Sequence, residues 1–470
     1  MPGVAYQPRG LGKEYVDPLA QVDACRRDVK LMKELGLNVI RVYEVDIDKN
    51  HDQCMSLFSD AGIYLILDLA TVKASINRDN PQWTLLLFDQ YKRTIDVFSR
   101  YTNTLAFFAG NEVTNNKSNA QASPFVKAAL RDIKMYIKDN VMKNGGRYVP
   151  VGYSSNDDPD IRVSLAEYFN CGNDDERADF FGMNLYEWCG ESSFEQSGYA
   201  ERTREFSSYS IPVILSEYGC NLVAPRPFTE VTAIYGPQMT SVWSGGIAYE
   251  WSQEINSYGL VVIDGQDGNV KKLQDFYNLK YQLEQATGNF NRFEKILNMD
   301  EYRPINIEPS KCPNNSDTWN ASIILPQTPR REVCECMVST LTCVTSSKIP
   351  NDRELMNKQF KMVCGLVDCA NISADGRNGK YGNYSYCGPE DKLSYIFDAY
   401  YKAQNEHKEA CEFKGAAKIT TPTKSSLEEC ANKTRSGVAS LVVEKAGGRI
   451  KKVQGLSILV WFIFSVWGYF

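Results

Sequence analysis

Short apolar runs alternate with longer amphipathic stretches through the first part of the chain. Such runs are typical of buried parallel strands, and the stretches between them are typical of helices that cover a sheet. Within residues 23–35, apolar side chains recur at helical spacing, and Gly36 is suited to end this helix. We expect eight strands, at residues 3–7, 38–45, 63–69, 105–111, 148–153, 180–186, 212–217 and 246–251.

Eight strand–helix units within residues 1–288 match the size of a (β/α)8 TIM barrel, an α/β fold. A doubly wound open sheet is the alternative, but no glycine-rich phosphate loop follows any of the expected strands. We therefore predict a closed barrel. In such a barrel the active site lies at the C-terminal ends of the strands.

Two of the expected strands end in a glutamate. Glu112 closes the segment Phe-Ala-Gly-Asn-Glu at residues 108–112, and Glu217 lies in Ile-Leu-Ser-Glu-Tyr-Gly at residues 214–219. These belong to the fourth and seventh strands, so the barrel predicts that both carboxyl groups face one another across its mouth. Opposed carboxyl groups are what glycoside cleavage requires.

Other polar or aromatic side chains are also expected at the strand ends. Any one of them alone is adequately explained as a polar residue at the point where a buried strand reaches the surface, but the whole set predicts a catalytic cleft. The set consists of Gln7, Arg41, Tyr43, Asp68, Asn111, Glu112, Tyr153, Asn184, Tyr186, Glu217, Tyr249 and Glu250.

The chain contains two histidines, His51 and His407, and we expect both at the surface. A Ser-His-Asp triad or a histidine-ligated metal needs an imidazole in the barrel mouth, so these classes are disfavoured. A cysteine nucleophile is disfavoured because it lacks a partner imidazole at any strand end. We predict neither a metal nor an organic cofactor.

The composition limits the classes of binding partner and the cellular compartment that we expect. A net charge of −6, with no basic stretch beyond residues 449–452, gives no reason to expect a nucleic-acid partner. The 12% of aromatic residues suits stacking on sugars, although ordinary core packing explains most of them. Fourteen cysteines and six Asn-x-Ser/Thr acceptors indicate a secreted protein. Residues 1–6 do not resemble a signal peptide, so we expect the start to be missing.

The end of the chain has the features of a GPI-attachment signal. An apolar tail, residues 453–470, follows the basic spacer 449–452 and the small residues 446–448. A second small-residue cluster at Ser436 and Gly437 is another possible attachment site. A membrane span is the alternative, but a stop-transfer helix should be followed rather than preceded by Lys and Arg.

Five segments carry a family resemblance. They are Gly-Val-Ala-Tyr-Gln at 3–7, Asn-Val-Ile-Arg-Val-Tyr at 38–43, Gly-Asn-Glu-Val at 110–113, Asn-Leu-Tyr-Glu-Trp-Cys at 184–189 and Ser-Glu-Tyr-Gly-Cys at 216–220. In this order they closely resemble the fungal β-1,3-glucanosyltransferases of glycoside hydrolase family 72, the Gas, Gel and Phr proteins. The resemblance extends from Gly3 onward.

The resemblance implies a retaining mechanism, with Glu112 as general acid/base and Glu217 as nucleophile. Such a mechanism requires carboxyl groups about 5 to 5.5 Å apart and a higher pKa for Glu112 than for Glu217. The resemblance also implies that Arg41 and Tyr186 keep Glu217 ionised and that Asn111 holds the sugar 2-hydroxyl. Tyr186 is a further implied glucan-binding residue. The others, for which ordinary packing is the alternative, are Gln7, Tyr43, Asp68, Tyr249 and Tyr258.

The activity that the resemblance implies is transfer between glucans. The enzyme cleaves a β-1,3-glucan donor and joins the new reducing end to the non-reducing end of an acceptor glucan. A retaining endo-β-1,3-glucanase and a catalytically silent glucan-binding wall protein are the alternatives. We expect a monomer that is held by a GPI anchor at the extracellular face of the plasma membrane and in the cell wall.

The composition changes after the barrel. Residues 289–332 form a proline-containing connecting segment, residues 333–432 hold eight cysteines, and residues 433–470 form a linker and the attachment signal. The cysteine-rich segment resembles the X8/CBM43 module, which implies a small, mainly helical domain with four disulfides. A zinc cluster is the alternative. For the other six cysteines the resemblance implies the pairs Cys25–Cys54, Cys171–Cys312 and Cys189–Cys220, although six cysteines permit other connectivities.

Overall fold

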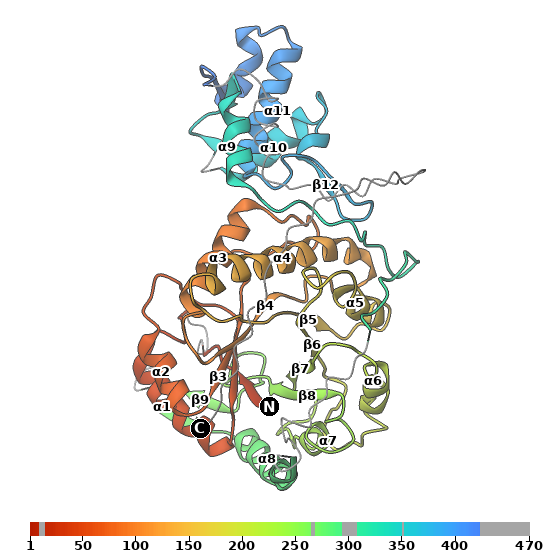
Figure 1. Ribbon diagram of the computed structural model, residues 1–470. Helices are drawn as coiled ribbons and strands as arrows, with labels where there is room; N and C mark the ends of the chain where they lie inside the picture. The colour runs from red at the N-terminus through yellow and green to blue at the C-terminus, as the bar shows by residue number, and fades with distance from the viewer. Residues whose placement is uncertain (9–14, 265–267, 294–307, 350–351, 424–470) are drawn as a thin grey trace, which may run out of the picture.

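The computed structural model describes residues 1–8, 15–264, 268–293, 308–349 and 352–423. Its first part is a closed barrel of eight parallel strands that follow one another in chain order, as predicted (Figure 1). The barrel strands are β1 (Pro2–Ala5), β2 (Val39–Val42), β3 (Tyr64–Asp68), β4 (Thr104–Asn111), β5 (Val151–Asn156), β6 (Phe180–Asn184), β7 (Val213–Tyr218) and β8 (Trp243–Ala248).

Helices surround the barrel (Figure 1). They are α1 (Val22–Leu35), α2 (Asp52–Asp60), α3 (Leu85–Phe98), α4 (Ser123–Tyr136), α5 (Arg162–Phe169), α6 (Tyr199–Glu205), α7 (Glu230–Ile234) and α8 (Gln274–Phe293), with the short helical segments η1 (Lys117–Ala122) and η2 (Ile137–Met142) and the hairpin β9 (Val261–Ile263) and β10 (Val270–Lys272). Gly36 ends α1 with φ of 73°, the left-handed conformation that a glycine adopts without strain.

Every barrel strand differs from its predicted range by one or more residues at its ends, and the differences at β5 and β8 bear on candidate residues. β5 begins at Val151 rather than at residue 148, and β8 runs from Trp243 to Ala248 rather than over 246–251. Tyr153 therefore lies within β5 and not at its end. Its ring stacks on Phe169 of α5 at 4.2 Å, so its predicted place in the barrel mouth is wrong.

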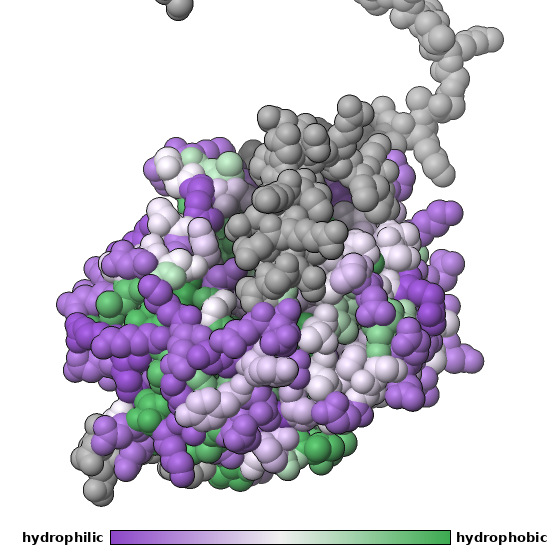
Figure 2. Space-filling view, turned by 90° about the horizontal axis from the view of Figure 1, so that it is seen from below, coloured by the Kyte–Doolittle hydropathy of each residue, from purple (hydrophilic) through white to green (hydrophobic). Residues whose placement is uncertain are grey.

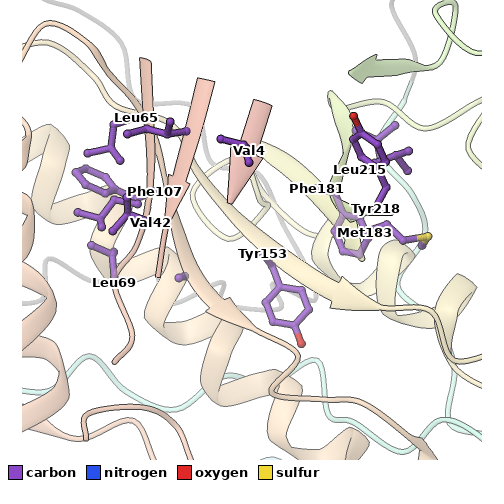
Figure 3. Packing of buried hydrophobic residues seen from close by; sticks show 14 of the residues in the cluster. Val4, Val42, Leu65, Leu69, Phe107, Tyr153, Phe181, Met183, Leu215 and Tyr218 are labelled. Carbon is purple, nitrogen blue, oxygen red and sulfur yellow. The ribbon is translucent and has the colours of Figure 1, made fainter. Parts of the chain in front are cut away.

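Two apolar layers hold the barrel together. The larger layer lies between strands and helices and contains alternate strand residues such as Val4, Leu65 and Phe181 (Figure 3). The smaller layer fills the barrel interior and contains the residues next to them, among them Ala5 and Ile66. This alternation is the period of two expected for strands in a barrel.

Small and large residues share the barrel interior. The rings of Phe108 and Phe180 lie there with centroids 5.0 Å apart. A Cβ atom at Gly182 would come within 2.6 Å of Ser216 Oγ and 2.9 Å of the Phe108 ring. Glycine at 182 is therefore needed so that β4, β6 and β7 can approach one another.

His51 is completely buried, which contradicts the expectation that both histidines lie at the surface. Its Nε2 is 2.8 Å from Oδ2 of Asp17, and its ring packs on Phe98. The buried carboxylate supplies the partner that lets a polar ring enter the core. His407 is exposed, as expected.

A second, smaller part follows at residues 331–423 and lies beside α3 and α4 (Figure 1). It has three helices, α9 (Arg331–Ser339), α10 (Arg353–Val363) and α11 (Pro389–Ala403), two strand pairs, β11 (Cys343–Thr345) with β14 (Ala417–Ile419) and β12 (Ala374–Asp375) with β13 (Lys380–Tyr381), and the short segments η4 (Ala370–Ile372), η5 (Lys408–Cys411) and η6 (Phe413–Gly415). This is the predicted small, mainly helical domain.

Disulfides are present in both parts. The barrel part contains Cys25–Cys54, Cys171–Cys312 and Cys189–Cys220, the three pairs that the resemblance implies. The smaller part contains Cys334–Cys387, Cys343–Cys411 and Cys364–Cys369, and Cys336 is also disulfide-bonded. Cys430 and residues 433–470 lie outside the described residues. Among the residues that the structure does describe, no helix is long and apolar enough to cross a membrane.

The smaller part packs against the barrel through specific contacts. The backbone N–H of Leu85, at the start of α3, donates to the carbonyl oxygen of Tyr386 at 2.8 Å. Nζ of Lys392 donates to Oε1 of Gln82 at 2.6 Å, and the rings of Phe125 and Tyr381 meet edge to face. The opposite side of the barrel is mostly hydrophilic, with apolar side chains in small separate groups (Figure 2).

We predict that Gly182→Ala destabilises the barrel by about 1–3 kcal/mol, because the added methyl group overpacks the interior beside Phe108. Urea unfolding followed by tryptophan fluorescence measures the change. Gly365→Ala in the smaller part is the control, since its nearest new neighbour is a carbonyl oxygen at 3.3 Å. Equal stability of Gly182→Ala and the unmodified chain would contradict the close packing described for this layer.

Candidate active site

Both predicted glutamates lie at the C-terminal ends of their strands. Glu112 directly follows β4, and Glu217 is the last residue but one of β7. Each strand carries a register shift here, because β4 and β7 each place one extra residue opposite their neighbours. Such bulges change the direction in which a side chain points and are common beside active sites.

Glu217 is buried and receives three hydrogen bonds. Oε1 accepts from Nη1 of Arg41 at 3.3 Å and from the hydroxyl of Tyr43 at 2.8 Å. Oε2 accepts from the hydroxyl of Tyr186 at 2.8 Å. The carboxyl group is thus held in one orientation by residues from β2 and from the segments after β2 and β6.

The pKa of Glu217 is raised above its ordinary value. Burial is the largest cause, and the charge of Arg41 and the bonds from Tyr186 and Tyr43 act in the opposite direction without cancelling it. The charge of Glu112 adds to the increase, which places the two carboxyl groups within electrostatic reach of each other. Arg41 and Tyr186 therefore favour the ionised form, as the resemblance implies, but do not outweigh desolvation.

Arg41 is completely buried beneath Glu217 and connects several groups. Its Nε and Nη2 donate to the two carboxylate oxygens of Asp68 at 3.1 and 2.9 Å, and Nη2 also donates to Oδ1 of Asn111 at 3.0 Å. The guanidinium lies 4.5 Å from the ring of Tyr43 and 4.6 Å from that of Phe108. Burial disfavours its charge, but the neighbouring Asp68 and Glu217 carboxylates raise the pKa of Arg41 above its ordinary value.

Glu112 is only half-buried and has a different environment. Its backbone has φ of 50°, a left-handed conformation that is uncommon outside glycine and occurs often in active sites. Its N–H donates to the carbonyl oxygen of Ser154 at 2.8 Å, and Nη2 of Arg78 donates to its carbonyl oxygen at 2.8 Å. These two contacts hold the unusual backbone in place.

Asn184 connects the two glutamate strands. Its Oδ1 accepts from the hydroxyls of Ser154 and Ser216, which orients Nδ2 toward Oε1 of Glu112 at 2.7 Å and Oδ1 of Asn111 at 3.2 Å. The sequence predicts Asn184 at a strand end but indicates no role for it. Its position at the end of β6 is the signal that the sequence offers, but its hydrogen-bond partners come from the ends of three other strands.

Four tyrosines line the mouth around Glu217: Tyr43, Tyr186, Tyr249 and Tyr258. The ring of Tyr249 lies edge to face with three others. Its centroid is 6.3 Å from that of Tyr43, 6.5 Å from that of Tyr186 and 5.3 Å from that of Tyr258. The ring centroids of Tyr186 and Tyr258 are 5.8 Å apart. The structure thus brings together the four tyrosines that the resemblance implies to bind glucan.

Gln7 and Asp68 are turned toward protein groups. Oε1 of Gln7 accepts from the backbone N–H groups of Tyr43 and Glu44, and Nε2 donates to the carbonyl oxygen of Glu44. Gln7 therefore fixes the segment that carries Tyr43. Asp68 is paired with Arg41, as described above.

A cavity of about 470 Å³ extends the mouth toward the loop between β3 and α3. Tyr43, Asp68 and Asn111 line its inner end, and residues of the segment 70–79, including Arg78, line its outer part. Its lining thus joins residues beside Glu217 to the loop that follows β3. In the part of the chain that the structure describes, no group of three or more His, Cys, Asp or Glu side chains could hold a metal ion.

Comparison with protein families finds two matches. The model of glycoside hydrolase family 72, described as glucanosyltransferase, matches residues 1–287. The X8 domain model matches residues 341–418.

Curated relatives and solved structures resemble the chain along most of its length. The protein EPD2 of Candida maltosa is 48% identical over 89% of this chain and 76% of its own length. A 1,3-beta-glucanosyltransferase of Arthroderma benhamiae is 44% identical over 97% of this chain and 84% of its own length. A Gas2p mutant of Saccharomyces cerevisiae, solved in complex with laminaritetraose and laminaripentaose, superposes with a TM-score of 0.80 at 41% identity, covering 93% of this chain and 94% of that chain. The chain therefore belongs to the glucanosyltransferases of glycoside hydrolase family 72.

Proposed function

We propose that this chain is a retaining β-1,3-glucanosyltransferase that elongates β-1,3-glucan. The observation that carries the proposal is the environment of Glu217, whose carboxyl group is held by Arg41, Tyr43 and Tyr186 within electrostatic reach of Glu112. A fixed, buried carboxylate beside a more exposed carboxyl group is the arrangement that double displacement at a sugar carbon needs. The relatives named glucanosyltransferases support the same activity.

In the first step a carboxylate oxygen of Glu217 attacks the anomeric carbon of the donor glucan. The bond to the glycosidic oxygen breaks, and Glu112 gives its proton to that oxygen, so the leaving chain departs with a free hydroxyl. This requires carboxyl groups about 5 to 5.5 Å apart, with Glu112 protonated and Glu217 ionised when substrate is bound.

In the second step Glu112 acts as base. It takes the proton of the 3-hydroxyl at the non-reducing end of an acceptor glucan, whose oxygen attacks the anomeric carbon and releases Glu217. No nucleotide sugar is consumed, because the energy of the broken glycosidic bond is kept in the glucosyl ester. Water in place of the acceptor gives hydrolysis, which is the activity of an endo-β-1,3-glucanase.

We assign substrate contacts from the remaining geometry. Oδ1 of Asn111 accepts from Arg41 and Asn184, so its Nδ2 is the atom that we assign to the sugar 2-hydroxyl. Tyr249 and Tyr258 supply apolar faces for stacking on glucose rings. Gln7 and Asp68 contribute through Tyr43 and Arg41, whose positions they fix.

We also propose that the protein acts as a monomer outside the cell, held at the plasma membrane and in the wall by a GPI anchor. Six disulfides among the described cysteines support an oxidising compartment. We propose the domain boundaries as expected, with a barrel at 1–288, a connecting segment at 289–332, an X8/CBM43-like module at 333–432 and the linker and signal at 433–470.

We predict that the unmodified chain converts a single laminari-oligosaccharide into products both longer and shorter than the substrate, because an acceptor glucan competes with water for the glycosyl group on Glu217. Chromatography of the products over time measures the two classes. If all products are shorter than the substrate, the activity is hydrolysis and not transfer. No products at all would favour a silent glucan-binding protein.

Glu217→Gln should reduce transfer and hydrolysis by about 10³-fold or more, because the amide cannot form the covalent intermediate. The same product assay measures the loss, and binding of the oligosaccharide by calorimetry checks that the variant is folded. Glu167→Gln, in α5 away from the mouth, is the matched control and should retain full activity. Undiminished activity of Glu217→Gln would show that Glu217 is not the nucleophile.

We predict that Tyr186→Phe moves the acidic limb of kcat/KM to higher pH. The Tyr186 hydroxyl lowers the pKa of Glu217, so its loss raises that pKa and the active carboxylate is protonated at a higher pH as pH falls. A pH profile of initial rates measures the shift. Tyr209→Phe, which removes a hydroxyl bonded to the carbonyl oxygen of Ala166, should leave the profile in place. A shift of the acidic limb to lower pH would contradict the assignment.

A further inference from the structure

We propose that Arg226 is a positioning residue that sets where the tyrosines Tyr249 and Tyr258 lie relative to Glu217, and thereby how tightly glucan binds. This inference rests on the proposed function, in which those two rings contact the substrate. Arg226 lies in the loop between β7 and α7 and was not among the residues singled out from the sequence. It does not bond to Glu217 and is not a catalytic residue.

The guanidinium of Arg226 donates to three backbone carbonyl oxygens. Nη1 is 3.1 Å from the carbonyl oxygen of Gly219 and 2.6 Å from that of Tyr249, and Nη2 is 2.5 Å from that of Tyr258. The side chain is 1% exposed. In this water-poor environment the carbonyl groups of Gly219 and Tyr249 are bonded by this cation, and that of Tyr258 accepts both from it and from the backbone N–H of Glu250 at 3.0 Å.

These carbonyl groups belong to three separate segments of the mouth. Gly219 follows the last residue of β7, two positions after Glu217, and Tyr249 directly follows β8. Tyr258 lies in the loop between β8 and β9. One planar side chain thus joins the strand that carries Glu217 to both backbone segments that carry the predicted stacking rings.

The local sequence is adapted to this contact. Gly219 has φ of 110°, and a Cβ atom there would lie 3.1 Å from Nη1 of Arg226 and 3.1 Å from the ring of Phe228. Glycine therefore permits the close approach. The Phe228 ring lies 4.5 Å from the guanidinium carbon and covers one of its faces.

Asp275 of α8 balances the charge of Arg226. Its Oδ2 accepts from Nε at 2.6 Å, and its Oδ1 accepts from the backbone N–H of Arg226 at 3.3 Å. The ion pair and the carbonyl contacts use different nitrogens of the guanidinium. This division allows the two roles, charge balance and positioning, to be separated by mutation.

Lysine cannot replace the carbonyl contacts. Its three N–H donors radiate from one nitrogen, whereas arginine presents five in a planar fork that spans separate acceptors. Arg226→Lys keeps the positive charge beside Asp275 but releases at least one of the three segments. The tyrosines then occupy a range of positions, which weakens the complex with glucan more than it slows the chemical step at Glu217.

The test compares full-length variants at a temperature where each is folded. Arg226→Lys should raise KM for a laminari-oligosaccharide at least about fivefold, with kcat within about twofold and the pH limits of kcat unchanged. In the Glu217→Gln background, calorimetry should show a similar weakening of Kd for the same oligosaccharide. Asp275→Asn is the matched control, because it removes the counter-charge and leaves the three carbonyl bonds. It should lower thermal stability without a comparable change in KM.

Tyr258→Ala separates failure of this inference from failure of the proposed function. If Tyr258→Ala weakens binding and Arg226→Lys does not, Arg226 has no positioning role and the proposed function stands. If Tyr258→Ala leaves binding unchanged, the assigned stacking role and this inference are both wrong. If Arg226→Lys and Asp275→Asn change KM equally, the effect of Arg226 is one of stability alone and the inference is overturned.

A second variant is needed if Arg226→Lys does not fold. Nδ2 of the partly exposed Asn221 donates to the carbonyl oxygens of Asn256 and Ser257, beside Tyr258. Asn221→Ala therefore loosens the same loop without disturbing the core. Weaker glucan binding by this variant would support control of affinity by the loop's position, and unchanged binding would overturn the inference.

Discussion

One buried cation, the guanidinium of Arg41, holds the centre of the barrel mouth together. It stands between two largely buried carboxylates, Asp68 and Glu217, and supplies charge balance to both. With a bidentate bond to Asp68 on one side, the guanidinium has a fixed plane, and this plane determines which donor reaches Glu217. The nucleophile that we propose is thus oriented from beneath, leaving its approach to the cleft open.

The positions of both glutamates depend on an irregularity in the sheet. In a regular strand the side chain next to an inward-facing one points outward, so the side chains of Ser216 and Glu217 could not both point into the barrel mouth. The extra residue in β7 lets Ser216 bond to Asn184 while Glu217 meets its own three donors. The corresponding shift in β4 places Asn111 and Glu112 together in the same network.

The main features of the fold and of the site were accessible from sequence because they depend on short patterns. Alternating runs gave the eight strands, and glutamates at two strand ends, with the family resemblance, pointed to the cleft. Tyr153 and His51 were misplaced because the pattern reveals neither where a strand begins nor whether a distant carboxylate, here Asp17, will accompany a ring into the core. The roles of Asn184 and Arg226 were missed since their partners come from several strands and loops, which no local pattern reports. The raised pKa of Glu217 is likewise a balance of burial against three donors.

The contact between Leu85 and Tyr386 has a consequence for how the two parts of the molecule can be treated. Leu85 is the first residue of α3. The segment just before it contains Gln82, which accepts a hydrogen bond from Lys392 of the smaller part, and residues 70–79, several of which line the cavity. An isolated barrel would leave the backbone N–H of Leu85 without its acceptor and uncover the Leu85 side chain, which lies in one apolar cluster with Met337 and Tyr386. The smaller part therefore supports the start of α3 and the segment before it, and exchanging the smaller part between relatives also exchanges a support of the cleft wall.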